Sequence, residues 1–198
     1  MTENTFLLVG LGNPGREYKD NRHNVGFMLI DRLSVLLDVR MNRLQSKALV
    51  ASAVYQGRKL ILAKPQTYMN LSGQAVQGLV HFYKLPLENV MVAHDDLDLP
   101  FGVIRIRPGG GAGGQKGVAS TIERLGTKGF PRLRIGIGRP PGRMDAADYV
   151  LQNFPPADLL TLSETLGRAA EAALAFVAEG LEAAMNRFNG GVSEKGEA

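Results

Sequence analysis

The sequence contains no cysteine, which excludes disulfide bonds and catalysis by a thiolate nucleophile. No apolar run approaches the roughly 20 residues that a membrane-spanning helix requires. The first residues, MTENTF, lack the basic region and following apolar region of a secretory signal peptide. We therefore expect a cytoplasmic protein that does not enter a membrane.

Acidic residues are scarce in one part of the chain. Residues 101–143 contain nine basic side chains and a single acid, Glu123, so this segment carries a charge of +8, although the whole chain carries only +4. A basic segment within an acidic remainder indicates a binding surface for a polyanion. The alternative is a solvated basic face without a partner.

The remaining composition is ordinary for a soluble globular protein, with 198 residues, 44% apolar and 21% charged. This length favours one domain with a sizeable core. We expect that domain to span residues 1–189 and residues 190–198 to form a disordered tail.

Apolar periodicity predicts strands that alternate with helices. Strands are expected at residues 5–10, 48–55, 59–63, 89–94, 102–107 and 133–137. Helices are expected at residues 24–38, 72–83, 118–125 and 156–189, the last with a break near residues 166–168. The alternation predicts a single α/β domain with a twisted, mostly parallel mixed β-sheet flanked by helices, because the hairpin at residues 48–63 adds antiparallel pairing.

Residues 10–15, GLGNPG, match the G-x-G-x-x-G pattern of a dinucleotide-binding loop. Such a loop requires a helix directly after its third glycine and an acid at the end of the next strand. Here helical periodicity begins only near Val25, and Asp31 falls inside the predicted helix. We therefore favour a sharp turn at a strand end that presents Asn13.

Three histidines could act as a base: His23, His81 and His94. His81 lies on a predicted amphipathic helix, where a structural role is the simplest interpretation. His23 lies just before a helix, and a role in the capping region of that helix is the alternative to a chemical one. The chain has no G-x-S-x-G motif that would supply a nucleophilic serine.

Asp95, Asp96 and Asp98 follow His94 and together could bind a divalent metal ion. Consecutive strand residues point to opposite faces, however, so Asp95 and Asp96 are not expected to share one ion. An aspartate that orients a histidine is the more economical interpretation. Such a pair activates water, while neutral amides bind the substrate carbonyl and the developing oxyanion. The candidate amides are Asn13, Asn24 and Asn70.

Several motifs lie in a fixed order along the chain: VGLGNPG at 9–15 with Tyr18, RHNVG at 22–26, KPQTYMNLSG at 64–73, HDDLDLP at 94–100, the glycine run at 109–114, and RIGIGRP at 134–140. With these motifs the chain closely resembles the bacterial-type peptidyl-tRNA hydrolases from about residue 6 to residue 189. Their agreement in order over nearly the whole chain argues against a chance match.

The resemblance implies hydrolysis of the ester that joins a peptide to the 3′-terminal ribose of tRNA, with no metal or other cofactor. This activity recycles tRNA released from stalled translation. His23 then corresponds to the general base and Asp95 to its orienting partner, while Asn13 and Asn70 hold the peptide and the attacking water. The other residues expected to bind substrate are Tyr18, Asn24, Tyr68, Met69 and Lys116.

The resemblance also gives the basic segment a partner. Arg107 and Arg134 match positions that clamp the 5′-phosphate of tRNA, and Arg105 lies on the same strand face. Such a clamp reads the shape of the acceptor arm instead of its sequence. The glycine run at 109–114 and the helix after it would form a movable cover over the cleft of a monomer.

Two departures from the family pattern stand out. Gln115-Lys116 replaces a common His-Asn pair, and Lys116 cannot accept a hydrogen bond as an amide can, although it could meet a phosphate or the substrate backbone. Asn21 replaces a common threonine, and either residue can cap the coming turn.

Two other classes of function compete with the esterase. One is a non-catalytic RNA-binding module with the same fold, and the other is a metal-dependent phosphohydrolase built on the three aspartates. The joint presence of His23, Asp95, Asn13 and Asn70 favours the esterase, because a binding module has no need of a general base and its partners.

Overall fold

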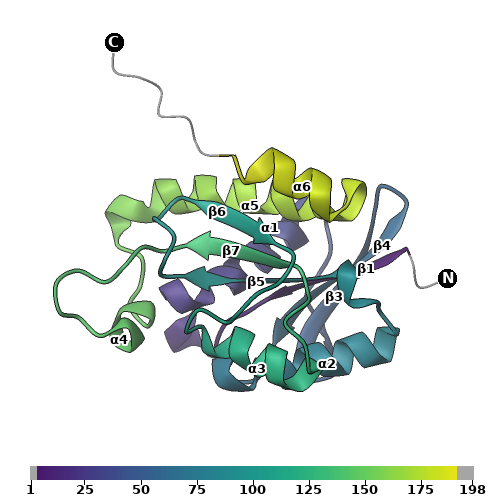
Figure 1. Cartoon of the computed structure of the whole chain (residues 1–198), viewed down its shortest axis with the longest axis horizontal. Coiled ribbons are helices and arrows are strands. Elements are labelled where there is room, and N and C mark those ends of the chain that lie inside the picture. Colours follow the sequence, from purple (N-terminus) through teal and green to yellow (C-terminus); the bar gives the residue numbers. More distant parts are fainter. Residues whose placement is uncertain (1–3, 191–198) are drawn as a thin grey trace, which may run out of the picture.

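Seven strands form one mixed sheet in the computed structural model, which describes residues 4–190 (Figure 1). Their order across the sheet is β2-β3-β4-β1-β5-β7-β6. The strands are β1 (Thr5–Gly10), β2 (Arg43–Gln45), β3 (Ala48–Tyr55), β4 (Arg58–Pro65), β5 (Val90–Asp96), β6 (Ile104–Arg107) and β7 (Arg132–Gly136).

The four central strands, β4, β1, β5 and β7, run parallel to one another. Antiparallel pairing adds β3 and β2 on one side and β6 on the other. The predicted α/β fold with a mixed sheet and a mostly parallel centre is therefore confirmed.

Helices cover both faces of this sheet. Helices α1 (Val25–Leu36), α5 (Leu159–Glu179) and α6 (Leu181–Phe188) share one apolar core with it, and α2 (Ser72–Tyr83) and α3 (Lys116–Leu125) share another. In Figure 1, α5 and α6 lie above the sheet and α2 and α3 below it. The short α4 (Ala146–Val150) lies at one end.

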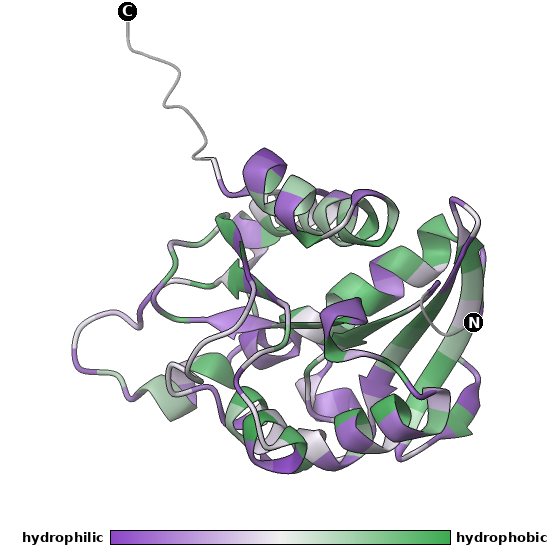
Figure 2. Cartoon of the chain, turned by 45° about the vertical axis from the view of Figure 1, so that its right-hand side comes forward, coloured by the Kyte–Doolittle hydropathy of each residue, from purple (hydrophilic) through white to green (hydrophobic). Residues whose placement is uncertain are grey.

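Strand β1 has a continuous apolar sequence because both of its faces are buried. Phe6 and Leu8 pack into the core under α1 and α5, whereas Leu7 and Val9 pack into the core under α2. Alternate side chains of a strand face opposite sides, so a strand buried on both faces is apolar throughout. Figure 2 accordingly shows the central strands mostly in green.

The structure corrects several expectations. No break occurs at residues 166–168, because α5 continues through Gly167, with Leu166 and Ala169 packed in the core. That packing outweighs the cost of about 1 kcal/mol that a glycine brings to a helix. The break lies at Gly180, whose φ of 94° is unfavourable for other residues.

Other differences are smaller. The short elements β2 and α4 are additions to the predicted set, and most other predicted ends lie within a few residues of the observed ones. His81 lies on α2, as predicted, and its side chain is exposed. The predicted tail lies outside the described residues, apart from Gly190. Among residues 4–190, no helix is both long and apolar enough to cross a membrane.

Candidate active site

The candidate site lies where three neighbouring parallel strands end. The segment after β1 carries Asn13, the 3₁₀ turn Met69–Leu71 after β4 carries Asn70, and Asp95 lies near the end of β5. Because β4, β1 and β5 are adjacent and parallel, their carboxyl ends meet at one edge of the sheet. His23 comes from another 3₁₀ turn, Arg22–Asn24, directly before α1.

Two glycines allow the start of α1 to lie directly on the end of β1. A Cβ on Gly10 would come within 2.0 Å of the Gly26 carbonyl oxygen, and a Cβ on Gly26 within 2.5 Å of the Leu11 backbone. The pattern GLGNPG therefore serves close packing that brings the His23 turn to the strand ends. It does not open a helix as a dinucleotide loop would, because α1 begins only at Val25.

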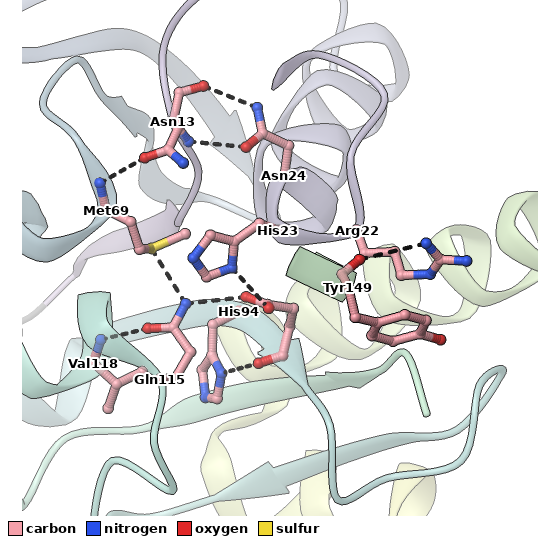
Figure 3. A network of polar contacts seen from close by, with 10 residues as sticks. Asn13, Arg22, His23, Asn24, Met69, His94, Gln115, Val118 and Tyr149 are labelled. Carbon is pink, nitrogen blue, oxygen red and sulfur yellow. Dashed lines mark hydrogen bonds and ion pairs between the residues drawn. The ribbon is translucent and has the colours of Figure 1, made fainter. Parts of the chain in front are cut away.

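His23 and Asp95 form the central pair of the site (Figure 3). The Nδ1 atom of His23 lies 2.8 Å from Oδ2 of Asp95, and the two side chains are 13% and 3% exposed. A carboxylate accepts hydrogen bonds, so Nδ1 carries the proton and Nε2 of the neutral ring is left as an acceptor. The pair has the geometry of a base and its orienting acid, and His23 makes no helix cap.

Asn13 is fixed by three hydrogen bonds, which Figure 3 shows. Its backbone N–H donates to Oδ1 of Asn24, and its carbonyl oxygen accepts from Nδ2 of Asn24, both at 2.9 Å. Its side-chain Oδ1 accepts from the Met69 backbone N–H at 2.7 Å. The Nδ2 group of Asn13 is left to donate at the cleft that this residue lines.

A cleft of about 590 Å³ opens beside this pair. His23, Asn13, Met69 and Asn70 line it together with the exposed Tyr68 and Lys116. Among residues 4–190, Lys116 has neither a hydrogen-bond nor an ion-pair partner, so its ammonium group is available to a ligand. The end of the glycine run, residues 112–114, forms another wall, in agreement with its expected position over the cleft.

Two of the predicted substrate-binding residues lie elsewhere. Asn24 is 2% exposed, and its side-chain amide forms two hydrogen bonds with the Asn13 backbone. It therefore holds Asn13 in position without lining the cleft. Tyr18, in the 3₁₀ helix Arg16–Tyr18, is outside the set of residues that line the cleft.

Arg22, the first residue of the RHNVG motif, contributes to the site in a way that the motif alone did not indicate. Its guanidinium is buried 4.2 Å from the centroid of the Tyr149 ring in α4 and donates to the Tyr149 carbonyl oxygen at 3.5 Å (Figure 3). It also donates to the Gln152 carbonyl oxygen at 3.3 Å. This contact joins the His23 turn to α4, which forms an apolar wall of the cleft through Val150. Neighbouring Asn21 does not cap the turn as predicted, because its Nδ2 donates instead to Asn153.

Gln115 is a second residue whose role the sequence did not reveal. Its Nε2 donates to Oδ1 of Asp95 at 3.0 Å, and its Oε1 accepts from the Val118 backbone N–H at 2.8 Å. The pattern GGQKG placed it beside the glycine run, but only the fold brings it to the end of β5.

The other two aspartates and His94 have separate partners. Asp96 pairs with Arg134 at 2.6 Å and Asp98 with Arg139, so neither joins Asp95. Within residues 4–190, no three His, Asp or Glu side chains are grouped to hold a metal ion. His94 donates from Nδ1 to the Asp95 carbonyl oxygen, and burial lowers its pKa, which keeps the ring neutral.

The arginines of the basic segment meet at the β6–β7 edge of the sheet. Arg105 pairs in register with Arg134, and Arg107 with Arg132, so all four side chains share one face. Arg107 is exposed and Arg105 and Arg134 are half-buried. The pair with Asp96 uses Nε of Arg134, and its two terminal nitrogens make no hydrogen bond within residues 4–190.

Arg132 differs from the other three because it is buried. It donates to the carbonyl oxygens of Gly111 and Lys128 and lies 4.5 Å from the centroid of the Phe130 ring. Burial lowers its pKa, and neighbouring Arg134 acts in the same direction. Its contact with Gly111 ties the glycine run to β7, so Arg132 supports the loop and is not part of the exposed basic surface.

The fold and the site together define an α/β protein with a hydrogen-bonded histidine–aspartate pair in an open cleft. The peptidyl-tRNA hydrolase family model matches residues 7–197. The peptidyl-tRNA hydrolase of Chloroflexus aggregans is 50% identical, covering 93% of this chain and 98% of that one. That of Caldanaerobacter subterraneus is 49% identical, covering 93% and 100%.

A solved structure agrees with these sequence matches. The crystal structure of peptidyl-tRNA hydrolase from Acinetobacter baumannii superposes with a TM-score of 0.87 at 34% identity, covering 94% of this chain and 95% of that one. The chain therefore belongs to the peptidyl-tRNA hydrolase family and is a hydrolase, as its motifs predicted.

Proposed function

We propose that this hydrolase cleaves the ester between a peptide, or an N-blocked amino acid, and the 3′-terminal ribose of tRNA, with His23 as the general base. The observation that carries the mechanism is the 2.8 Å contact between His23 Nδ1 and Asp95, which leaves Nε2 as the acceptor in a residue that lines the cleft. No covalent nucleophile is needed, because a water molecule held by Nε2 can attack the ester carbonyl directly.

The reaction follows from this arrangement. His23 Nε2 takes a proton from water as the oxygen attacks the carbonyl carbon, and the ionised Asp95 stabilises the imidazolium that forms. The amides of Asn13 and Asn70 hold the water and the developing oxyanion, since neutral amides donate without titrating. When the tetrahedral intermediate collapses, the imidazolium returns the proton to the ribose oxygen. The products are free tRNA and a peptide with a new carboxyl group.

The cleft has walls suited to the two halves of the substrate. Met69 and Tyr68 offer an apolar surface to the peptide. Lys116 has a free ammonium group at the start of α3, suited to a phosphate of the tRNA 3′ end. Asn24 supports this cleft from outside its lining through its bonds to the Asn13 backbone.

The basic edge suits the 5′-phosphate of the acceptor arm. The terminal nitrogens of Arg134 have no protein partner within residues 4–190, while Asp96 holds its Nε and so orients the guanidinium fork toward an incoming phosphate. Arg105 and Arg107 lie on the same face and add to the positive field. We place this activity in a cytoplasmic monomer.

The test is release of an N-blocked amino acid from N-blocked aminoacyl-tRNA in EDTA. We expect full activity of the wild type and, for His23→Ala, a loss on the order of 10²- to 10⁴-fold in turnover with tRNA affinity unchanged. A variant that hydrolyses within a few-fold of wild type would refute the general-base role. Activity that requires an added metal ion would refute the metal-free mechanism.

A further inference from the structure

The side-chain amide of Gln115 has three partners, and two of them, besides a contact of Nε2 with Sδ of Met69 at 3.2 Å, determine its orientation. Its Oε1 accepts from the Val118 N–H at the start of α3, and its Nε2 donates to Oδ1 of Asp95. A backbone N–H needs an acceptor and a carboxylate needs a donor, so a rotation of the amide by 180° would break both contacts. Figure 3 shows the two bonds leaving opposite atoms of the amide.

The two oxygens of Asp95 are divided between two side chains. His23 takes Oδ2 and Gln115 takes Oδ1, in a carboxylate that is only 3% exposed. Water therefore has little access to replace Gln115, which is itself 8% exposed. A hydrogen bond to a buried carboxylate stabilises its charged form and fixes the plane in which its other oxygen meets the histidine.

We infer that Gln115 is a positioning residue for the catalytic pair, which holds the Asp95 carboxylate in place and aims its Oδ2 at His23 Nδ1. Gln115 lies at the junction between the glycine run and α3. Its Oε1 caps α3 while its Nε2 bonds to Asp95, so the side chain connects the start of the helix to the carboxylate. The inference rests on the proposed role of His23 as general base.

Gln115→Glu separates this role from helix capping. Glutamate has the same length and keeps an oxygen for the Val118 N–H, but once ionised it replaces the donor facing Asp95 with a second negative charge, so kcat is compared above the pH at which the two carboxyl groups share a proton. We expect kcat to fall about 10- to 100-fold, as for loss of a buried hydrogen bond to a charged group, with KM unchanged. The added charge favours the protonated imidazole, so the acid limb of the kcat–pH profile moves to higher pH.

Two further variants complete the series. Gln115→His restores a ring N–H donor toward Asp95 and should recover most of kcat and return the acid limb toward its wild-type position. The matched control is Gln77→Glu, which makes an equal charge change at an exposed glutamine on α2. It should leave kcat and the position of the acid limb unchanged. The other charged groups that line the cleft, Asp96, Lys116 and Asp145, are the same in every variant.

Each outcome decides the inference. Wild-type kcat and an unmoved acid limb in Gln115→Glu would overturn the inference. Equal losses of kcat in Gln115→Glu and Gln115→His, without a shift of the acid limb, would also overturn it, because they would mean a structural role only. If Gln115→Glu fails to melt cooperatively, Gln115→Met, with no donor, must show the kcat loss at constant KM. His23→Ala is assayed alongside: if it stays active, the proposed mechanism fails, whereas an inactive His23→Ala with a normal Gln115→Glu refutes only this inference.

Discussion

The two functional regions of the sheet differ in how their charged side chains are held. At the end of β5, Asp95 is buried and both of its oxygens are bonded, whereas Arg105 and Arg107 on β6 form no ion pair within residues 4–190. A reaction centre needs its atoms fixed to a fraction of an ångström. Phosphate recognition works through a field that tolerates motion and weakens with salt. We therefore expect changes at the first region to alter turnover and changes at the second to alter affinity.

The largest effect is expected from Asp95→Asn. The amide cannot stabilise an imidazolium, and its NH₂ group facing Nδ1 would favour the wrong tautomer of His23. We expect kcat to fall by about 10³- to 10⁴-fold while tRNA affinity stays at the wild-type value. Single-turnover release and a separate tRNA-binding measurement check the two halves of this expectation.

Asp98→Asn is the matched control, because Asp98 undergoes the same chemical change three residues further along the chain, where it pairs with Arg139 on the surface. Its turnover should match the wild type. Equal losses in the two variants, or a loss of tRNA binding in Asp95→Asn, would contradict the separation between the regions.

A smaller effect is expected at the basic edge. Arg107→Ala and Arg134→Ala should each weaken tRNA binding several-fold and lower the slope of log affinity against log salt by about 1, because each removes one phosphate contact. Single-turnover rates at saturating enzyme should not change. Filter binding across a salt series measures the slope.

A modified tRNA and a control variant test whether Arg107 and Arg134 contact the 5′-phosphate. With tRNA that lacks its 5′-phosphate, the two variants and the wild type should bind alike if these arginines contact that group. Arg40→Ala removes an exposed arginine near β2, at the opposite edge of the sheet, and should leave the slope at its wild-type value. A slope unchanged in all three variants would count against the clamp.

The sequence predicted those parts of the molecule that local patterns determine. The bounds of β1, β3 and α2 are as predicted, because their apolar periodicity is unambiguous and turn residues flank them. The family resemblance, and no local pattern, implied that His23 and Asp95 are partners although they lie 72 residues apart, and the structure brings them within hydrogen-bonding distance.

What the sequence did not reveal depends on tertiary contacts. Helix α4 is five residues long and is held by the stacking of Arg22 on Tyr149, which no local pattern encodes. Gln115 caps α3, and its bond to Asp95 exists only because α3 begins beside the end of β5, which the sequence does not show. Arg132 resembles its exposed neighbours in sequence, yet the packing of Phe130 and the glycine run buries it.

The smallest effect is expected at His94 on β5, which lies between the two regions. His94 directly precedes Asp95 and pairs in register with Arg134. Burial lowers its pKa below the ordinary value of 6.5. Below that pH the unfolded chain therefore binds a proton that the folded chain does not, and the free energy of unfolding falls as the pH falls. His94→Gln removes this titration, so urea denaturation between pH 7 and pH 5 should show a shallower loss of stability than in the wild type. A parallel loss in both proteins would mean that His94 can be protonated in the folded state, and β5 would then carry a positive charge between the proposed catalytic pair and the proposed phosphate-binding edge.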